Sequence, residues 1–150
     1  MPKQDFAMSR DANCIFCKIV AKEISAAVIH EDSAVVSFLD IGPLAEGHLL
    51  VIPRDHYGRL TDVSPDVCAR IGSVLPVLGR ALLTVTGASA FNALCNEGQA
   101  AGQLVSHVHF HLIPRRSGDA LGYRWNAGTY AEGRAAELAA AYQRALAQHH

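Results

Sequence analysis

Short runs of apolar residues alternate with turn-forming residues along most of the chain. Four such runs span residues 26–30, 34–39, 47–53 and 91–95. Their length and their content of Val, Ile and Phe predict β-strands. The turn Glu31-Asp32-Ser33 joins the first two runs and predicts a hairpin. The third run is continuous in apolar residues, which is typical of a central strand.

A helical period replaces this pattern after residue 63. Apolar residues recur there every three or four positions, at Val67, Ile71, Val74, Leu75, Leu78, Leu82 and Val85. This spacing predicts one long amphipathic helix. Ser64 and Pro65 are typical of its first turn, and Gly87 is typical of its end. Pro76 interrupts the apolar stripe and predicts a bend in the helix.

A fifth run combines strand periodicity with a chemical pattern. Three histidines alternate with apolar residues in the order Val105-Ser106-His107-Val108-His109-Phe110-His111-Leu112-Ile113. Successive side chains of a strand point to opposite faces, so the three imidazoles share one face and the apolar face can pack on a core. Imidazole can be a metal ligand, a general acid or base, or a nucleophile near neutral pH. Only eight residues of the chain are histidine, so this grouping indicates a site rather than a solvated face.

The remaining segments complete a single α+β domain over residues 1–150. Residues 1–12 are polar and predict a flexible arm. Thr129 and Glu132 resemble a capping box, and the Ala-rich residues after them predict a C-terminal helix over 129–147. His149 and His150 are either native or the start of a purification tag. The predicted order of elements is typical of a five-stranded antiparallel sheet with one long helix and a C-terminal helix.

Composition narrows the classes of function. Half of the residues are hydrophobic, 18% are charged and the formal net charge is −1, so no basic field attracts nucleic acid. No apolar run approaches the roughly 20 residues of a membrane span, and the N-terminus lacks the apolar core of a secretory signal. The sequence therefore predicts a cytoplasmic protein that binds neither nucleic acid nor membrane. Free thiols are favoured in that compartment, so the four cysteines need an explanation other than disulfides.

The histidine row resembles that of the histidine triad family of nucleotide hydrolases and transferases. The family pattern is His-φ-His-φ-His-φ-φ, where φ is apolar, and residues 107–113 match it at every position. Other segments also resemble the family in the expected order: Ile15-Phe16-Cys17-Lys18-Ile19-Val20, Phe38-Leu39-Asp40-Ile41, Gly47-His48-Leu49-Leu50-Val51-Ile52-Pro53 and Asn96-Glu97-Gly98. The resemblance covers residues 14–116 and implies a histidine triad fold.

This resemblance implies catalysis by a histidine nucleophile. In the family, a histidine attacks an α-phosphate, a nucleotidyl-histidine forms, and water hydrolyses it, so two easier displacements replace one. The middle histidine, His109, matches the nucleophile, whose tautomer is set by a nearby backbone carbonyl. His111 matches the residue that contacts the phosphate oxygens, and His107 completes the catalytic row. His48 matches a fourth, auxiliary histidine, although a structural histidine explains it equally well.

The resemblance also implies the position of the nucleotide. Phe16, Ile19, Phe38 and Ile41 match positions that line the base pocket, and Asp40 matches the acid that binds the ribose hydroxyls. Candidate phosphate-binding residues come from the Gly-rich turn before the histidine row, namely Asn96, Gly102 and Gln103, because side-chain and backbone amides can donate to phosphate oxygens. Taken singly, the apolar residues are explained by core burial and Asp40 by a turn.

Cys14 and Cys17 form a CxxC pair, which alone indicates a redox site, a metal site or neither. No thioredoxin-like βαβ pattern follows it, which argues against a redox site. Some histidine triad proteins, and the related galactose-1-phosphate uridylyltransferases, bind a structural zinc through such a pair, a later histidine and the first triad histidine. The resemblance thus implies one Zn²⁺ held by Cys14, Cys17, His56 and His107. The alternative is a buried pair of free thiols.

Two features leave the substrate open. Many family members have Ser or Thr where this chain has Leu104, and that hydroxyl helps to hold the phosphate or leaving group. Asn96 resembles the phosphoramidate-hydrolysing branch, whereas Ile113-Pro114-Arg115 resembles the branch that cleaves dinucleoside polyphosphates. The expected substrates are therefore purine nucleoside phosphoramidates or dinucleoside polyphosphates. The alternative function is a non-catalytic, zinc-stabilised interaction protein that binds nucleotides. The helix over residues 64–86 and the strand after it resemble the family's dimer surface and predict a C₂ homodimer.

Overall fold

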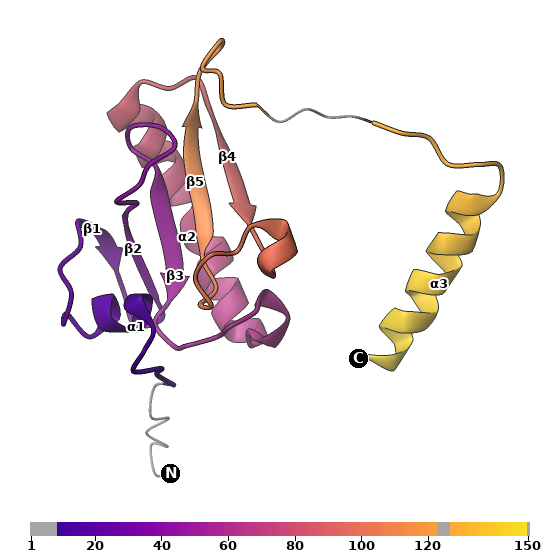
Figure 1. Ribbon diagram of the computed structural model, residues 1–150, viewed down its shortest axis with the longest axis horizontal. Helices are drawn as coiled ribbons and strands as arrows, with labels where there is room; N and C mark the ends of the chain where they lie inside the picture. Colours follow the sequence, from indigo (N-terminus) through magenta and orange to yellow (C-terminus); the bar gives the residue numbers. More distant parts are fainter. Residues whose placement is uncertain (1–8, 123–126, 150) are drawn as a thin grey trace.

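The structure, a computed structural model, describes residues 9–122 and 127–149. Within these residues, five strands form one antiparallel sheet in the order β1-β2-β3-β5-β4 (Figure 1). The strands are β1 (Val28–Glu31), β2 (Val35–Leu39), β3 (Leu49–Pro53), β4 (Ala90–Cys95) and β5 (Phe110–Arg115). The predicted α+β class and the central position of β3 are both confirmed.

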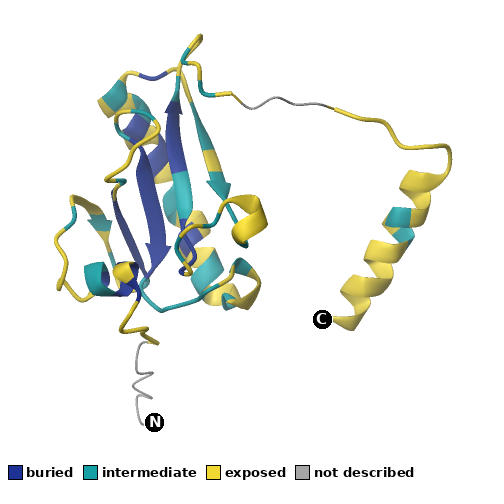
Figure 2. Cartoon of the chain, viewed as in Figure 1, coloured by how far each residue is buried: buried dark blue, intermediate teal, exposed yellow. Residues whose placement is uncertain are grey.

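Both faces of the sheet are covered. Alternate residues of β2 and β3 point to opposite faces, so two separate layers of apolar contacts form. One layer packs against helix α2 (Pro65–Thr86) and consists of Val35, Leu49, Val51, Ile71, Leu78, Leu82 and Leu112. The other packs against the short helix α1 (Ile15–Val20) and consists of Cys14, Phe16, Cys17, Val20, Val36, Phe38, Leu50 and Ile52. Strand β3 is therefore buried along its whole length (Figure 2).

Helix α2 has the predicted limits. The Ser64 hydroxyl accepts a hydrogen bond from the Val67 amide, and Gly87 ends the helix with a φ of 65°. The helix continues through Pro76 as one element of 22 residues. Pro76 removes one intrahelical bond to the carbonyl of Gly72. Both residues are exposed, so water can replace that bond.

Helix α2 also alters one expectation about the chain. By length and composition alone it could cross a membrane, with a mean hydropathy of 1.4. Its buried residues include Ile71, Leu78 and Leu82, which pack against the sheet. The expectation that no segment approaches a membrane span is corrected by this helix, and the absence of a membrane partner stays a prediction.

The C-terminal helix, α3 (Arg134–Gln148), begins later than predicted. Gly133 precedes it with a φ of 76°, and no side chain caps its first turn. The capping box predicted at Thr129 and Glu132 is therefore wrong, because the left-handed Gly133 interrupts the backbone between that motif and the helix. Helix α3 has no buried residue among those described and lies apart from the sheet (Figures 1 and 2).

Three further features differ from the sequence-based prediction. Helix α1 was not predicted, since six residues are too few to establish a helical period. Strand β5 begins at Phe110 rather than residue 105. Residues 1–8 of the predicted flexible arm lie outside the described residues, but its described end is held in place. There, the carbonyl of Ser9 accepts a 2.8 Å hydrogen bond from the His56 amide, and Arg10 pairs with Glu23.

Candidate functional site

The histidine row lies on the face of the sheet that carries α1. His107 and His109 precede β5 and are buried, and His111 lies within the strand. The Phe16 ring contacts both of the first two, with ring centroids 5.8 Å from His107 and 5.2 Å from His109. Leu112 belongs to the opposite layer, against α2. The predicted division of the row into an imidazole face and an apolar face is therefore confirmed, although the regular strand is shorter.

A cavity of about 880 Å³ opens in front of this row. The lining residues that the sequence predicted are Phe16, Ile19, Phe38, Asp40, Ile41, His48, Asn96, Gly102, His109 and His111. Ile41 is fully exposed and lies at the rim. Two predicted residues, Gln103 and His107, do not line the cavity.

Gln103 binds backbone groups instead of facing the cavity. Its side-chain oxygen accepts a 2.8 Å bond from the Gly98 amide, and its nitrogen donates to the carbonyls of Gly58 and Val105 at 2.9 and 3.0 Å. Both amide hydrogens and one acceptor position of the Gln103 side chain thus hold the turn before the histidine row. The structure gives Gln103 a positioning role for the turn, and its contact with a nucleotide stays a prediction.

The ring of His109 is oriented by the backbone two residues before it. Its Nδ1 lies 2.7 Å from the carbonyl oxygen of His107. A carbonyl can only accept, so Nδ1 carries the hydrogen and, in the neutral ring, Nε2 keeps a free electron pair. His109 lines the cavity, where such a nitrogen can attack an electrophile. This carbonyl contact is the one that the family resemblance implied.

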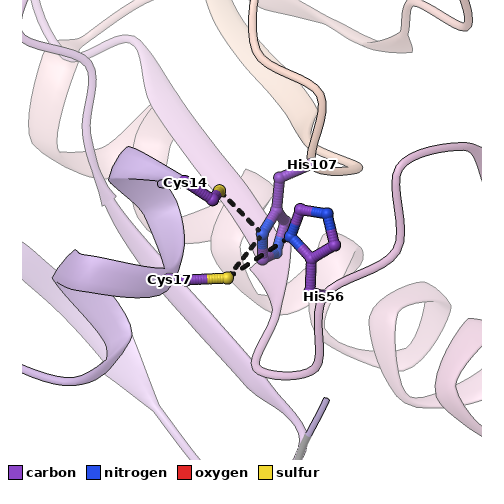
Figure 3. A group of neighbouring side chains, drawn as sticks. All are labelled: Cys14, Cys17, His56 and His107. Carbon is purple, nitrogen blue, oxygen red and sulfur yellow. Dashed lines mark hydrogen bonds between the residues drawn. The ribbon is translucent and has the colours of Figure 1, made fainter. Parts of the chain in front are cut away.

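His107 belongs to a second cluster, which also contains Cys14, Cys17 and His56 (Figure 3). Its Nε2 donates to the carbonyl of Pro53 at 2.9 Å, which leaves Nδ1 unprotonated. That nitrogen lies 3.4 Å from the sulfur of Cys14 and 3.6 Å from the sulfur of Cys17. Nδ1 of His56 is 3.3 Å from the Cys17 sulfur. The four donor atoms all lie within 4.8 Å of one another.

The donor set of this cluster fits a metal ion. Two thiols and two imidazoles are a common tetrahedral zinc set, in which the cysteines bind as thiolates and the histidines as neutral rings. Burial lowers the pKa of His107 to about 4, helped by the nearby rings of His56 and His109. Burial also raises the pKa of Cys17, as does the neighbouring Cys14 thiol. In the absence of a cation the Cys17 thiol stays protonated, so binding a metal would displace its proton.

The opposite end of the row has a different set of neighbours. His111 Nδ1 lies 2.9 Å from His48 Nε2, and Asp40 Oδ2 lies 3.7 Å from the same His48 nitrogen. The other oxygen of Asp40 accepts a 2.8 Å bond from the Gly42 amide. Burial lowers the pKa of His48, and burial with the neighbouring rings lowers the pKa of His111 to about 4. Both rings are therefore neutral near pH 7.

Much of the cavity wall was not predicted from the sequence. The missed lining residues are Ile15, Ile24, Ser25, Ala26, Ala27, Leu39, Gly42, Leu44, Leu50 and Val105. Most are apolar and carry no chemical signature, so only their three-dimensional proximity identifies them. Leu104, singled out as a departure from the family pattern, is 93% exposed at the rim.

Comparison with known proteins places these features in a family. The HIT domain family model matches residues 21–118. The adenylylsulfatase HINT3 of Arabidopsis thaliana is 41% identical over 109 residues, which span 73% of this chain and 55% of that longer protein. The adenosine 5'-monophosphoramidase hnt1 of Schizosaccharomyces pombe is 39% identical over 114 residues, which span 75% of this chain and 83% of that protein.

Solved structures show the same fold. A zinc-bound histidine triad family protein from Mycobacterium smegmatis superposes with a TM-score of 0.70 and 41% identity. The superposition covers 75% of this chain and 81% of the Mycobacterium chain.

Proposed function

This chain belongs to the histidine triad family, and we propose that it hydrolyses nucleotides through attack of His109 on an α-phosphate. In the first step, His109 Nε2 forms a bond to phosphorus, and the leaving group departs with the electron pair of the bond that breaks. The departing group takes up a proton from solvent. Water then attacks the phosphorus and releases one proton to solvent, the bond to Nε2 breaks with its electron pair returning to the ring, and a nucleoside monophosphate is released with neutral His109 restored. The observation that carries this proposal is the 2.7 Å contact of His109 Nδ1 with the His107 carbonyl, which leaves Nε2 free beside the cavity.

The charge of the cavity favours a phosphoramidate over a dinucleoside polyphosphate. Of the described residues that line it, none is Lys or Arg, and one is the acid Asp40. A polyphosphate chain carries several negative charges and is usually bound by Lys, Arg or a metal ion. One phosphoryl group can be held by Asn96, by His111 and by backbone amides near Gly102. The Schizosaccharomyces and Arabidopsis relatives are named as an adenosine 5'-monophosphoramidase and an adenylylsulfatase. Both names support a substrate with one phosphoryl group rather than a polyphosphate chain.

The nucleoside would occupy the apolar part of the cavity. Phe16, Ile19 and Phe38 offer surfaces for a purine base without hydrogen-bond donors or acceptors. One oxygen of Asp40 is bound to the Gly42 amide, and the carboxylate keeps acceptor capacity for ribose hydroxyls. This arrangement supports purine nucleotides as ligands, with more discrimination at the sugar than at the base.

The cysteine–histidine cluster would hold a structural zinc ion. Cys14, Cys17, His56 and His107 supply the tetrahedral donor set that zinc prefers. The bound ion would join α1 to the backbone that orients His109 and would contribute to folding, without a direct part in the reaction. The zinc-bound Mycobacterium neighbour supports this assignment.

The outer face of α2 and strand β4 would form a C₂ homodimer interface. Val77 and Val85 are 56% and 84% exposed on that helix, and β4 is an edge strand with one unpaired side. Exposed apolar surface beside an open strand edge favours association with another chain. Sedimentation at micromolar concentration is expected to give twice the 16.1 kDa chain mass, and a single species of 16.1 kDa would contradict the dimer.

Turnover measurements test the hydrolase proposal directly. A fluorogenic adenosine phosphoramidate is compared with diadenosine tri- and tetraphosphate. We expect the phosphoramidate to be hydrolysed fastest. Nucleotide binding without turnover of any of the three substrates would instead favour a non-catalytic binding protein.

A further inference from the structure

Both ring nitrogens of His48, a histidine outside the row, make hydrogen-bonding contacts. We propose that His48 is a positioning residue, which holds His111 as a neutral hydrogen-bond donor directed at the substrate phosphate; this inference rests on the proposed hydrolase function. The geometry assigns this role through a chain of three hydrogen bonds that begins at a backbone amide.

The first bond sets the tautomer of His48. The backbone amide of Leu44 donates to His48 Nδ1 at 3.1 Å. An amide N–H can only donate, so Nδ1 must be an acceptor, and the hydrogen of the neutral ring lies on Nε2. A doubly protonated His48 would place an N–H against the Leu44 N–H. This contact therefore selects one of the two neutral forms of His48.

A tight turn brings Leu44 and His48 together. The His48 amide donates to the carbonyl of Ala45 at 3.0 Å, which closes a four-residue turn. Gly47 is the third residue of this turn and has a φ of +93°, a conformation that favours glycine. A Cβ at this position would lie 2.4 Å from Thr86 Cγ2. The turn before β3 thus requires glycine, and its shape fixes the His48 ring.

The second bond transfers this choice to His111. His48 Nε2 lies 2.9 Å from His111 Nδ1, and Asp40 Oδ2 is farther away at 3.7 Å. Because His48 Nε2 carries the hydrogen, His111 Nδ1 accepts it and the hydrogen of the neutral His111 ring lies on Nε2. An imidazolium at position 111 would oppose two N–H groups. The pair therefore favours neutral His111.

The third bond is made to the substrate. The rings of His109 and His111 have centroids 5.0 Å apart, and both line the cavity. His109 presents an electron pair on Nε2, whereas His111 presents a hydrogen on Nε2. One ring can attack phosphorus while the other donates to a phosphate oxygen as negative charge develops there. Two backbone groups, the His107 carbonyl and the Leu44 amide, set these opposite states.

The tautomers can be measured without any reaction. Two-bond ¹H–¹⁵N correlation spectra of the full chain distinguish protonated from unprotonated imidazole nitrogens. We expect Nε2–H forms for His48 and His111 and an Nδ1–H form for His109 in the wild type. An Nδ1–H form of His111 in the wild type would overturn the proposal.

Two substitutions test whether His48 causes the state of His111. Glutamine can place an amide donor near the position of the histidine Nε2, whereas methionine fills the space without a donor. We expect H48M to lower kcat by about tenfold or more, the size typical of a lost orienting partner, with a smaller change in KM. H48M should also give mixed tautomers of His111. H48Q should retain most of the wild-type kcat and most of the Nε2–H form of His111. H30M serves as the control, because His30 pairs with Asp32 outside the cavity.

The outcomes separate this proposal from the hydrolase function. Equal loss of kcat in H48Q and H48M, with the His111 tautomer unchanged in both, would overturn the positioning role. If the wild type turns over no nucleotide, the hydrolase proposal fails, and the spectra of the wild type and of H48M still decide whether His48 sets the state of His111.

Discussion

The two ends of the histidine row differ in their neighbours rather than in their residue type. His107 is fully buried, and it faces two sulfurs and a second imidazole from α1 and the loop after β3. His111 faces His48 and Asp40 at the wall of an open cavity. Burial lowers the pKa of both to about 4. The same side chain thus has the surroundings of a metal ligand at one end and of the proposed phosphate-binding donor at the other.

This difference shows how identical residues in one row come to have different surroundings. The alternation of the strand only places the imidazoles on one face. A backbone carbonyl then determines which ring nitrogen carries the hydrogen in two of the rings. This carbonyl belongs to Pro53 for His107 and to His107 for His109. The following experiments test whether changes at one end of the row leave the properties of the other end unchanged.

Replacing the middle histidine should have the largest effect on turnover. H109N removes the nucleophilic nitrogen but little volume, so we expect turnover to fall at least about a thousandfold, or about 4 kcal/mol of activation free energy. AMP affinity, zinc content and melting temperature should stay near wild type, because the two ends of the row are intact. Residual turnover within about tenfold of wild type, about 1.4 kcal/mol, would exclude His109 as the nucleophile.

Removing the metal should affect mainly the buried end. We expect one zinc per chain by elemental analysis, and a melting temperature lower by about 10 °C after chelation or in C17S. At about 3 °C per kcal/mol, that corresponds to about 3 kcal/mol of unfolding free energy. C68S is the matched control, because Cys68 lies outside the cluster. A metal-free protein that melts at the same temperature would contradict the structural role.

Acid should destabilise the metal-free protein through both ends of the row. The folded-state pKa of His107 is about 4, below the ordinary value of 6.5, so between these values the unfolded chain binds a proton that the folded chain does not. The unfolding free energy is therefore complete above about pH 6.5 and falls towards pH 4, by on the order of 3 kcal/mol for fully buried His107. His111 shifts in the same direction.

Urea unfolding at several pH values in a chelator measures this effect. Asp32 provides an internal contrast, since its pKa is lowered to about 2 and its contribution is lost only at still lower pH. An unfolding free energy that stays constant between pH 6.5 and 4 would contradict the neutral, buried state of these histidines.

The smallest effect concerns the sugar at the open end. If Asp40 binds both ribose hydroxyls, 2'-deoxy-AMP should bind more weakly than AMP by roughly 1.5–3 kcal/mol, the range for a hydrogen bond to a charged group. D40N should reduce this difference. GMP should bind within about tenfold of AMP, because the base meets apolar side chains. Titrations compare the three nucleotides, and equal affinity for AMP and its deoxy form in the wild type would remove Asp40 from this role.

Much of the fold could be predicted from local patterns. The strands follow from short apolar runs, and α2 follows from a period of about 3.6 residues. Ser64 and Gly87 mark the ends of α2 correctly because capping depends on neighbouring residues. The C-terminal helix shows the limit of such motifs. Thr129 and Glu132 have capping-box spacing, yet the helix starts after Gly133, whose left-handed backbone the motif did not take into account.

Local patterns identify the residues that could carry chemistry, whereas tertiary contacts distinguish their surroundings. The alternation of residues 107–111 is local, so the shared imidazole face could be predicted from the strand period. The approach of Cys14 and Cys17 to His107, and of His48 to His111, joins residues 63 to 93 positions apart. The contacts of Gln103 with Gly58 and Gly98, which hold the turn, likewise could not be predicted from the sequence. Such contacts depend on how α1, β3 and β5 pack together, because hydrogen bonds between distant residues leave no period in the sequence.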